Sequence, residues 1–169
     1  SAWADNDESC REKITATENI IRKTLGELVY GEEDDEVEDA AAAALLAASE
    51  SLATVEAGTA GRVAALFAQA AHRRAPTGQP FFCGGLVLPG LSAETSGLIS
   101  AAKDVASSHN ASVGMAVGPV RPNGIREAVD VVVVSKGSPI VTEHILGGGG
   151  IAMSRAAKSA INKIRRILL

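Results

Sequence analysis

The sequence is poor in aromatic residues, cysteine and histidine. Only 3% of its 169 residues are aromatic, and it holds two cysteines and three histidines. Cys10 and Cys83 lie far apart and belong to no CxxC or HxxxH motif, which argues against a disulfide framework and a zinc site. Free thiols of this kind are typical of a reducing compartment, so we expect a cytoplasmic protein without a metal or a cofactor.

Long hydrophobic runs are also missing. The longest cover residues 40–48 and 131–134, whereas a membrane span needs about 20 apolar residues. The N-terminus is acidic and lacks the basic-then-apolar pattern of a secretion signal. We therefore expect no membrane association.

Each half of the chain is short of one sign of charge. Residues 1–50 carry 14 acidic and 4 basic side chains, a balance of −10, and residues 51–169 carry 6 and 12, a balance of +6. The basic residues are scattered outside the last predicted helix, and no aromatic ladder accompanies them, so nucleic acid is not the expected partner. A small anionic or nucleotide ligand fits the positive half better.

Apolar spacing predicts helices over residues 15–28, 40–48, 62–72, 92–108 and 151–168. Strands are predicted over residues 51–56, 81–88, 111–117, 129–135 and 140–146, with a turn at 122–124 and the glycine pair of the second strand marking a bulge or a close approach. The acidic run over 32–39 is interpreted as a solvated helix start.

This order predicts an α/β fold, a three-layer α/β/α domain with a mixed, mostly parallel sheet, preceded by an N-terminal helix. Residues 1–31 would be a tail and the end of a preceding module or a linker helix, and residues 32–169 the domain itself. The order of the strands stays open.

Two glycine-rich turns precede predicted helices. In residues 56–61 (Glu-Ala-Gly-Thr-Ala-Gly), backbone amides at a helix N-terminus could hold an anion, but a tight strand-to-helix turn explains the same residues. The pattern is neither a P-loop nor GxGxxG. The four glycines of 147–150 could likewise form a phosphate nest or a plain link, and Arg155 would lie one turn into the helix that follows.

Groups that could carry catalysis are few. His72, His109 and His144 each lie near the end of a predicted element, and none has a neighbouring nucleophile that would form a pair with it. Glu56 and Glu143 would make a carboxylate pair only if the fold brought them together.

Four short stretches together resemble the C-terminal domain of competence-damage-inducible (CinA) proteins. Residues 25–33 resemble the junction before that domain, 54–61 its A-E-S-C-T-G-G turn, 84–87 its G-G-V-V strand and 116–119 the end of its T-G-I-A-G-P motif. The likeness covers about residues 20–169. It implies an α/β fold, assembly as a homo-oligomer and, in active members, hydrolysis of nicotinamide mononucleotide to nicotinate mononucleotide and ammonia.

The residues that carry the family's chemistry differ in this sequence. The nucleophilic serine falls on Ala57, the Y-S-N-E-A-K loop expected after Leu88 is missing, and the threonine that opens T-G-I-A-G-P falls on Gly114. The arginine of a G-D-R motif falls within residues 147–150, with Arg155 a few residues beyond. Amide hydrolysis needs a nucleophile or an activated water and a group that stabilises the oxyanion. The resemblance thus implies a catalytically degenerate member, a pseudoenzyme.

Three functions follow from this pattern. The chain could be a nucleotide- or anion-binding or oligomerisation module, a purely structural domain with an empty pocket, or an active deamidase that uses rearranged residues such as Glu56, Thr59 or Arg155. The expected ligand-binding residues are Gly58, Thr59, Ala60, Gly61, Gly84, Gly85, Gly118, Pro119, Gly149 and Gly150.

Overall fold

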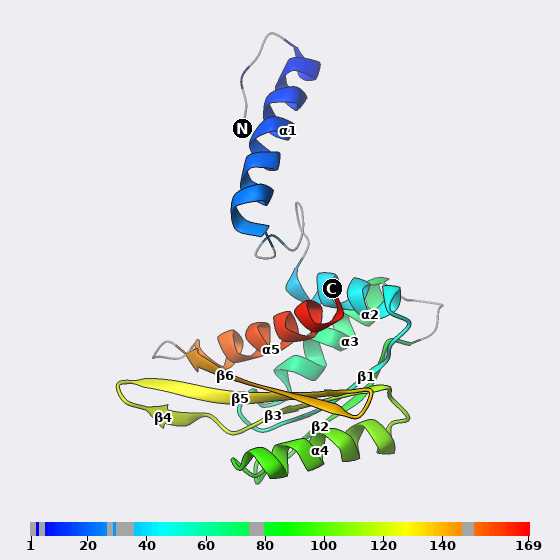
Figure 1. Cartoon of the computed structure of the whole chain (residues 1–169), viewed down its shortest axis with the longest axis vertical. Helices are drawn as coiled ribbons and strands as arrows, with labels where there is room; N and C mark the ends of the chain where they lie inside the picture. The colour runs from blue at the N-terminus through cyan, green and yellow to red at the C-terminus, as the bar shows by residue number, and fades with distance from the viewer. Residues whose placement is uncertain (1–2, 4–5, 27–28, 30–35, 75–79, 147–150) are drawn as a thin grey trace. The chain divides into compact units, whose positions relative to one another are not determined.

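A computed structural model of the chain describes residues 3, 6–26, 29, 36–74, 80–146 and 151–169. The chain divides into two compact units, Ser1–Asp35 and Glu36–Leu169. The first unit contains helix α1 (Asp7–Leu25), and the second contains all the other helices and strands of the described residues (Figure 1).

Helix α1 begins before the predicted residue 15. The Asn6 side chain caps it by accepting a hydrogen bond of 2.9 Å from the Ser9 amide, and Asp7 and Glu8 occupy the first turn, where the helix dipole favours negative charge. Apolar periodicity misses this start because the first large apolar residue of the helix is Ile14.

The second unit is built on a mixed sheet. Strands β1 (Leu52–Glu56), β2 (Phe82–Val87) and β3 (Val113–Val117) pair in parallel in the order β2-β1-β3. Strand β5 (Arg126–Ser135) runs antiparallel to β3, to β4 (Arg121–Asn123) and to β6 (Ser138–Leu146). Five of the six strands in the described residues therefore point the same way, which confirms the predicted mixed, mostly parallel sheet.

Strand β4 continues β3 along the same edge of β5, a feature that the sequence did not reveal. Val117 pairs with Val131 and Arg121 with Ala128, so three residues on one side face two on the other, as in a β-bulge. The Gly118 amide donates to the Asp130 carbonyl there at 2.9 Å. The turn predicted at 122–124 is therefore a strand up to Asn123, and the chain reverses at Gly124, which has a φ of +61°.

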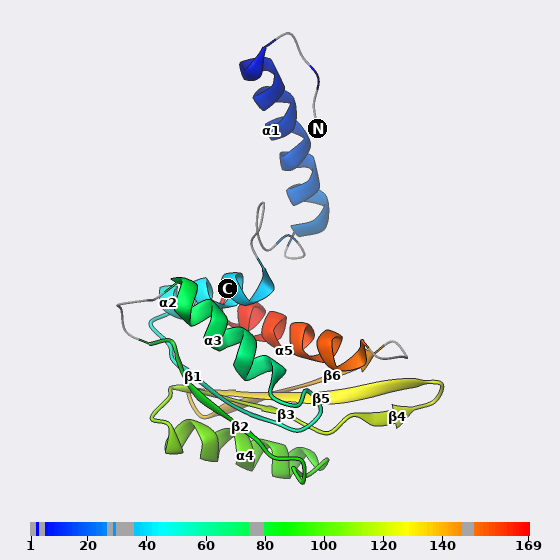
Figure 2. The same cartoon turned by 180° about the vertical axis from the view of Figure 1, so that it is seen from behind.

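The helices cover both faces of the sheet and complete the predicted three layers (Figures 1 and 2). Helices α2 (Val37–Ala47), α3 (Arg62–Arg74) and α5 (Ala152–Leu168) share one apolar core with one face of the sheet. Helix α4 (Thr95–Ser108) forms a second, smaller core on the other face. The valine run of β5 is buried on both faces, as its continuous apolar sequence predicts.

Small residues let α4 lie close to the sheet. A Cβ placed on Gly114 of β3 would lie 1.9 Å from the Ala102 carbonyl oxygen, which belongs to the backbone of α4. A threonine at this position, as in the family motif, would push the helix outward. The departure at residue 114 therefore has a packing cause.

Gly114→Ala should lower the free energy of unfolding by about 3 kcal/mol, because the added methyl group meets helix backbone that cannot rotate away. Gly90→Ala is the control, since no atom lies within 4 Å of its added Cβ, and it should change stability by less than about 0.5 kcal/mol. Urea unfolding measures both. Equal stability of the two variants would contradict the close approach.

Two acidic residues at the start of α2 are buried, contrary to the predicted solvated helix start. Glu38 and Asp39 are 3% and 4% exposed. Lys158 of α5 donates to Glu38 at 2.7 Å, and Arg73 and Arg74 of α3 bind Asp39 at 3.0 and 3.4 Å. These ion pairs join three helices on one face of the sheet. Residues 32–35 of the acidic run lie outside the described residues.

The ion pair at Asp39 should make stability depend on acid pH. Burial alone would raise the pKa of the Asp39 carboxyl, but hydrogen bonds from Arg73, the Glu36 amide and Arg74 outweigh burial and leave this pKa below its ordinary value. A lowered folded-state pKa stabilises the protein above about pH 4, and the contribution disappears as the pH falls through the folded-state value.

Asp39→Asn should therefore cost about 1 kcal/mol or more at pH 7 and progressively less as the pH falls below about 4. We expect a smaller loss of stability than for a fully buried ion pair, because the Arg73 and Arg74 side chains are 43% and 40% exposed. Asp104→Asn, on the exposed surface of α4, is the control and should be neutral. Thermal unfolding of the three proteins across pH tests this, and a pH-independent difference would contradict it.

Candidate functional site

The turn between β1 and α3 lies at the carboxyl ends of the parallel strands. Glu56, Val87 and Val117 are register partners at the ends of β1, β2 and β3. Residues 57–61, 88–90 and 118–120 therefore leave the sheet at one edge, where α/β proteins commonly bind ligands.

The Glu56 side chain closes the N-terminus of α3. It is completely buried, and its carboxylate accepts hydrogen bonds from the Thr59 hydroxyl at 2.5 Å, the Val63 amide at 3.1 Å and the Ala64 amide at 2.8 Å. A carboxylate in this place satisfies helix amides that have no partner within the helix and interacts favourably with the helix dipole. Glu56 is an internal anion at the position where an external anion was expected.

Most other amides of the turn are also occupied. Ala57 and Gly58 donate to the carbonyls of Val117 and Gly118, at 2.9 and 3.0 Å. Ala60 and Arg62 donate to carbonyls within the turn itself. Among residues 57–64, only the amides of Thr59 and Gly61 have no hydrogen-bond partner in the described part of the chain.

Backbone geometry accounts for the small residues of the turn. A Cβ on Gly58 would lie 2.5 Å from the Gly118 carbonyl oxygen, so the turn and the end of β3 touch through their main chains. Ala60 and Gly61 both have a positive φ, +50° and +84°. A non-glycine residue in this conformation is uncommon, and Ala60 is held there by the bonds on either side.

The glycine pair of β2 lies within the strand and away from its carboxyl end. A Cβ on Gly85 would meet the Thr54 hydroxyl at 2.5 Å and the Ala64 methyl at 2.8 Å, and one on Gly84 would meet the His109 ring at 2.8 Å. The register between β1 and β2 shifts just before Gly84, which confirms the predicted bulge or close approach. Protein atoms therefore occupy the space beside both glycines.

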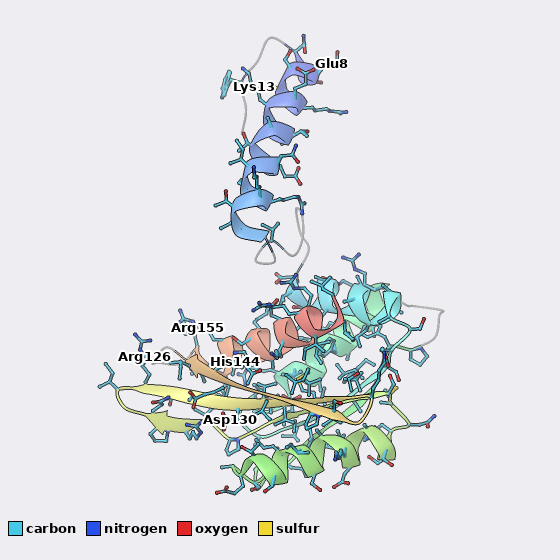
Figure 3. The ribbon with its side chains drawn as sticks, in the orientation of Figure 1. Glu8, Lys13, Arg126, Asp130, His144 and Arg155 are labelled. Carbon is cyan, nitrogen blue, oxygen red and sulfur yellow. The ribbon has the colours of Figure 1, made fainter. Side chains whose placement is uncertain are left out.

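Arg155 lies in the first turn of helix α5 and is exposed (Figure 3). In the described residues, no hydrogen bond or ion pair joins its side chain to residues 57–61, between β1 and α3. Arg62 of α3 links the two helices instead: it donates to the Met153 sulfur of α5 at 3.6 Å, and it also donates to the Thr59 carbonyl of the turn before α3 at 3.4 Å. Gly149 and Gly150 lie outside the described residues, so their expected role stays a prediction.

Glu56 and Glu143 do not form a carboxylate pair. Glu56 faces α3, whereas Glu143 of β6 lies beside Asp130 on the opposite face of the sheet and binds Arg121 at 2.5 Å. His144, the next residue of β6, has a buried Nε2 without a hydrogen-bond partner in the described residues. Burial lowers its pKa, as does nearby Lys163, although Asp130 opposes the shift (Figure 3).

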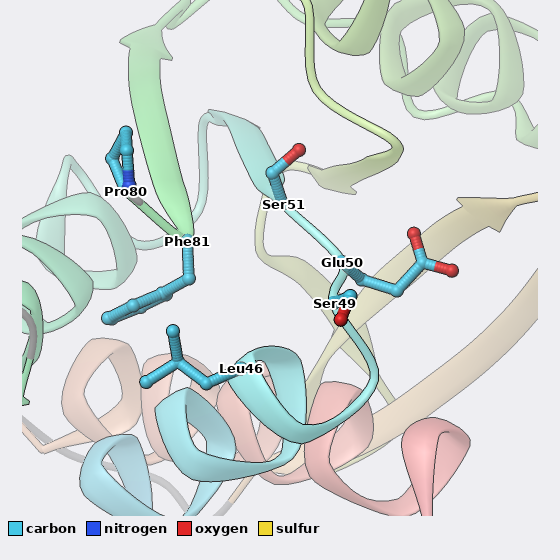
Figure 4. A pocket seen from close by; sticks show the side chains of 6 residues that line it. All are labelled: Leu46, Ser49, Glu50, Ser51, Pro80 and Phe81. Atoms are coloured by element: carbon cyan, nitrogen blue, oxygen red, sulfur yellow. The ribbon is translucent and has the colours of Figure 1, made fainter. Parts of the chain in front are cut away.

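A cavity of about 380 Å³ lies at the opposite end of the sheet, where α2 ends and β1 and β2 begin (Figure 4). Its lining is of mixed polarity: Leu46, Ser49, Glu50, Ser51, Pro80 and Phe81. None of the expected site residues lines it.

The described residues contain no cluster of three or more His, Cys, Asp or Glu side chains that could hold a metal ion. Among the described helices, none combines the length and the hydropathy that a membrane span requires.

These features define an α/β/α domain whose candidate site, at the carboxyl ends of parallel strands, is closed by one of its own carboxylates. Solved structures of CinA superfamily proteins have the same fold. The protein from Klebsiella pneumoniae 700603 superposes with a TM-score of 0.60 at 16% identity, over 78% of this chain and 95% of that one. The competence/damage-inducible protein from Agrobacterium tumefaciens gives 0.54 at 15% identity, over 82% and 96%.

A CinA superfamily protein from Enterobacter cloacae gives a TM-score of 0.54 at 14% identity, over 83% of this chain and 94% of that one. No family model matches the sequence, and no curated protein does. The resemblance seen in the short motifs is thereby confirmed at the level of the fold. The second unit contains 134 of the 169 residues. This fraction is close to the 78–83% of the chain that superposes on these structures.

Glu56→Gln should destabilise the domain by about 2 kcal/mol, because one carboxylate oxygen that accepts helix amides is replaced by an NH₂ group that cannot. Glu94→Gln is the matched control: Glu94 occupies the N-cap of α4 but makes no capping hydrogen bond with its side chain. In thermal unfolding, Glu56→Gln should have a lower Tm than the parent chain, whereas Glu94→Gln should have the same Tm as the parent chain. A neutral Glu56→Gln would show that the cap contributes little.

Proposed function

We propose that this chain is a non-catalytic relative of the CinA superfamily proteins whose domain serves as an assembly module. The observation that carries the proposal is the chemistry at the carboxyl ends of the strands. Ala57 occupies the position of the family nucleophile, and the two oxygen-bearing side chains beside it, Glu56 and Thr59, are buried and bonded to each other. Neither is placed to attack an amide.

Two apolar sheet edges support assembly. Leu86, Val87 and Leu88 at the β2 edge are 42%, 48% and 45% exposed, and Val141 and Ile145 at the β6 edge are 44% and 47% exposed. Neither outer edge is paired with another strand in the described residues. Open apolar edges of this kind are surfaces on which a second chain can pair.

Binding of a small anion or nucleotide is a second candidate function. It is favoured by the amides of Thr59 and Gly61, which have no hydrogen-bond partner among the residues that the structure describes, and by the exposed Arg62 that donates to the Thr59 carbonyl. It is opposed by the Glu56 carboxylate, which already lies at the N-terminus of α3. We therefore place it second.

An assay of ammonia release from nicotinamide mononucleotide tests the absence of catalysis. At high protein concentration the chain should release no ammonia above the buffer rate, and Ala57→Ser should not restore activity because the family's Tyr and Lys loop is also missing. Release that Thr59→Val abolishes and Thr59→Ser retains would instead support an active deamidase with rearranged residues.

Ligand-induced stabilisation separates assembly from anion binding. A ligand that binds only the folded state should add about 2.7 kcal/mol at 100 times its dissociation constant. Assembly predicts no such shift with nicotinamide mononucleotide, nicotinate mononucleotide or phosphate, together with a light-scattering mass above 17.2 kDa. A 17.2 kDa particle that one of these anions stabilises would reverse the order of the two candidates.

A further inference from the structure

Helix α1 exposes a row of aliphatic side chains. None of its residues is buried, and Ile14, Ile20, Ile21 and Leu25 are 52%, 66%, 45% and 47% exposed. In proteins most helical stability comes from packing of one apolar face rather than from the helix propensity of the sequence. The row therefore needs a partner.

Two residues of this row, Ile14 and Ile21, also have the spacing of a coiled-coil seam. Cys10, Ile14, Thr17, Ile21 and Thr24 follow one another at alternating steps of four and three residues, which places Ile14 and Ile21 at a positions of a heptad repeat and the other three at d positions. The aliphatic residues Ile20 and Leu25 lie at the g and e positions that flank this seam, so the apolar face that a second helix would cover extends beyond the a and d positions. β-Branched residues at a positions are a feature of two-stranded parallel coiled coils, in which leucine is the usual d residue; here cysteine and threonine occupy d.

The hydroxyl groups of the two seam threonines already have hydrogen-bond partners within the helix. The Thr17 hydroxyl donates to the Lys13 carbonyl at 2.9 Å, and the Thr24 hydroxyl donates to the Ile20 carbonyl at 2.8 Å. Because each hydroxyl is satisfied within its own helix, a facing helix would meet the threonine methyl groups without leaving a polar group unpaired.

The residues that flank the seam complement a second copy of the same helix. In a parallel pair, each g residue faces the e residue five positions later in the partner. Lys13 would face Glu18 of the second copy, a pair of opposite charges, and Ile20 would face Leu25, a pair of aliphatic side chains. In the single chain Lys13, which is labelled in Figure 3, donates to the Trp3 carbonyl. Glu18 binds Arg22 at 2.7 Å.

We propose that α1 pairs with α1 of a second copy of this chain as a parallel, in-register, two-stranded coiled coil with Ile14 and Ile21 at its centre. This inference deepens the proposed assembly role by naming one of its interfaces. It depends on the residues of the first unit alone, so it can fail while assembly through the sheet edges persists, and the reverse also holds.

Disulfide trapping at Cys10 tests the orientation. In a parallel pair the two Cys10 side chains face each other at a d position, whereas in an antiparallel pair they lie near opposite ends of a helix about 28 Å long. The full chain carrying Cys83→Ser, treated with a mild thiol oxidant, should form a reducible dimer on a gel. Absence of this dimer at concentrations where light scattering shows association would overturn the proposal.

Matched substitutions test the seam. In the Cys83→Ser chain, Ile21→Lys should reduce the rate of Cys10 crosslinking at least tenfold, because it places a charge in the seam. Ala16→Lys adds the same charge at an outward c position and should leave the rate within twofold. Equal rates for the two variants would overturn the proposal, even if light scattering still showed a dimer formed through the second unit.

Charge reversal tests the flanking pair. Lys13→Glu and Glu18→Lys should each slow crosslinking severalfold, because each places like charges opposite one another, and the double variant should recover the rate of the parent chain. Failure of the double variant to recover would exclude the parallel pairing of residues 13 and 18. Circular dichroism of each variant at high concentration confirms that the second unit is folded.

Discussion

The carboxylate of Glu56 at the N-terminus of α3 determines which polar groups remain available at the carboxyl ends of the parallel strands. Three donors, two of them helix amides, converge on a side chain from which water is completely excluded. Removal of a charged acceptor from such a place leaves unsatisfied donors, so the turn depends on it. The same bonds also occupy the Thr59 hydroxyl and two of the first helix amides, so structural support at this turn leaves few groups for chemistry.

Close contacts between main-chain atoms also hold the other loops at the carboxyl ends of the strands in place. Gly58 lies against the Gly118 carbonyl, and Ala57 and Gly58 donate to the end of β3, so the loops after β1 and β3 are fastened to each other. On the far face, Gly114 lets the backbone of α4 touch β3. Gly58 and Gly85, two glycines that the short motifs associate with a ligand, also lie where neighbouring elements of the fold approach closely.

The sequence predicted the layers of the fold, because these depend on apolar periodicity and on breaks at glycine and proline. It missed the start of α1, which is specified by the Asn6 cap, and β4, whose Pro122 is typical of a turn but is tolerated on a strand with only one partner. The burial of Glu38 and Asp39 was also missed, since their arginine and lysine partners lie on helices distant in the sequence. For the same reason, no pattern in the sequence could show that Glu56 caps α3.

The opposite charges of the two halves of the chain now have an internal explanation. Glu36, Glu38 and Asp39, from the acidic half, bind Lys158, Arg73 and Arg74, from the basic half. Lys136 likewise approaches Glu50 at 3.7 Å. Part of the positive charge of the basic half is thus paired within the fold, and this weakens the electrostatic case for an anionic ligand. Apolar side chains at the sheet edges and along α1 have no comparable partner within the described residues of their own units, and the proposed assembly with a second copy rests on these surfaces.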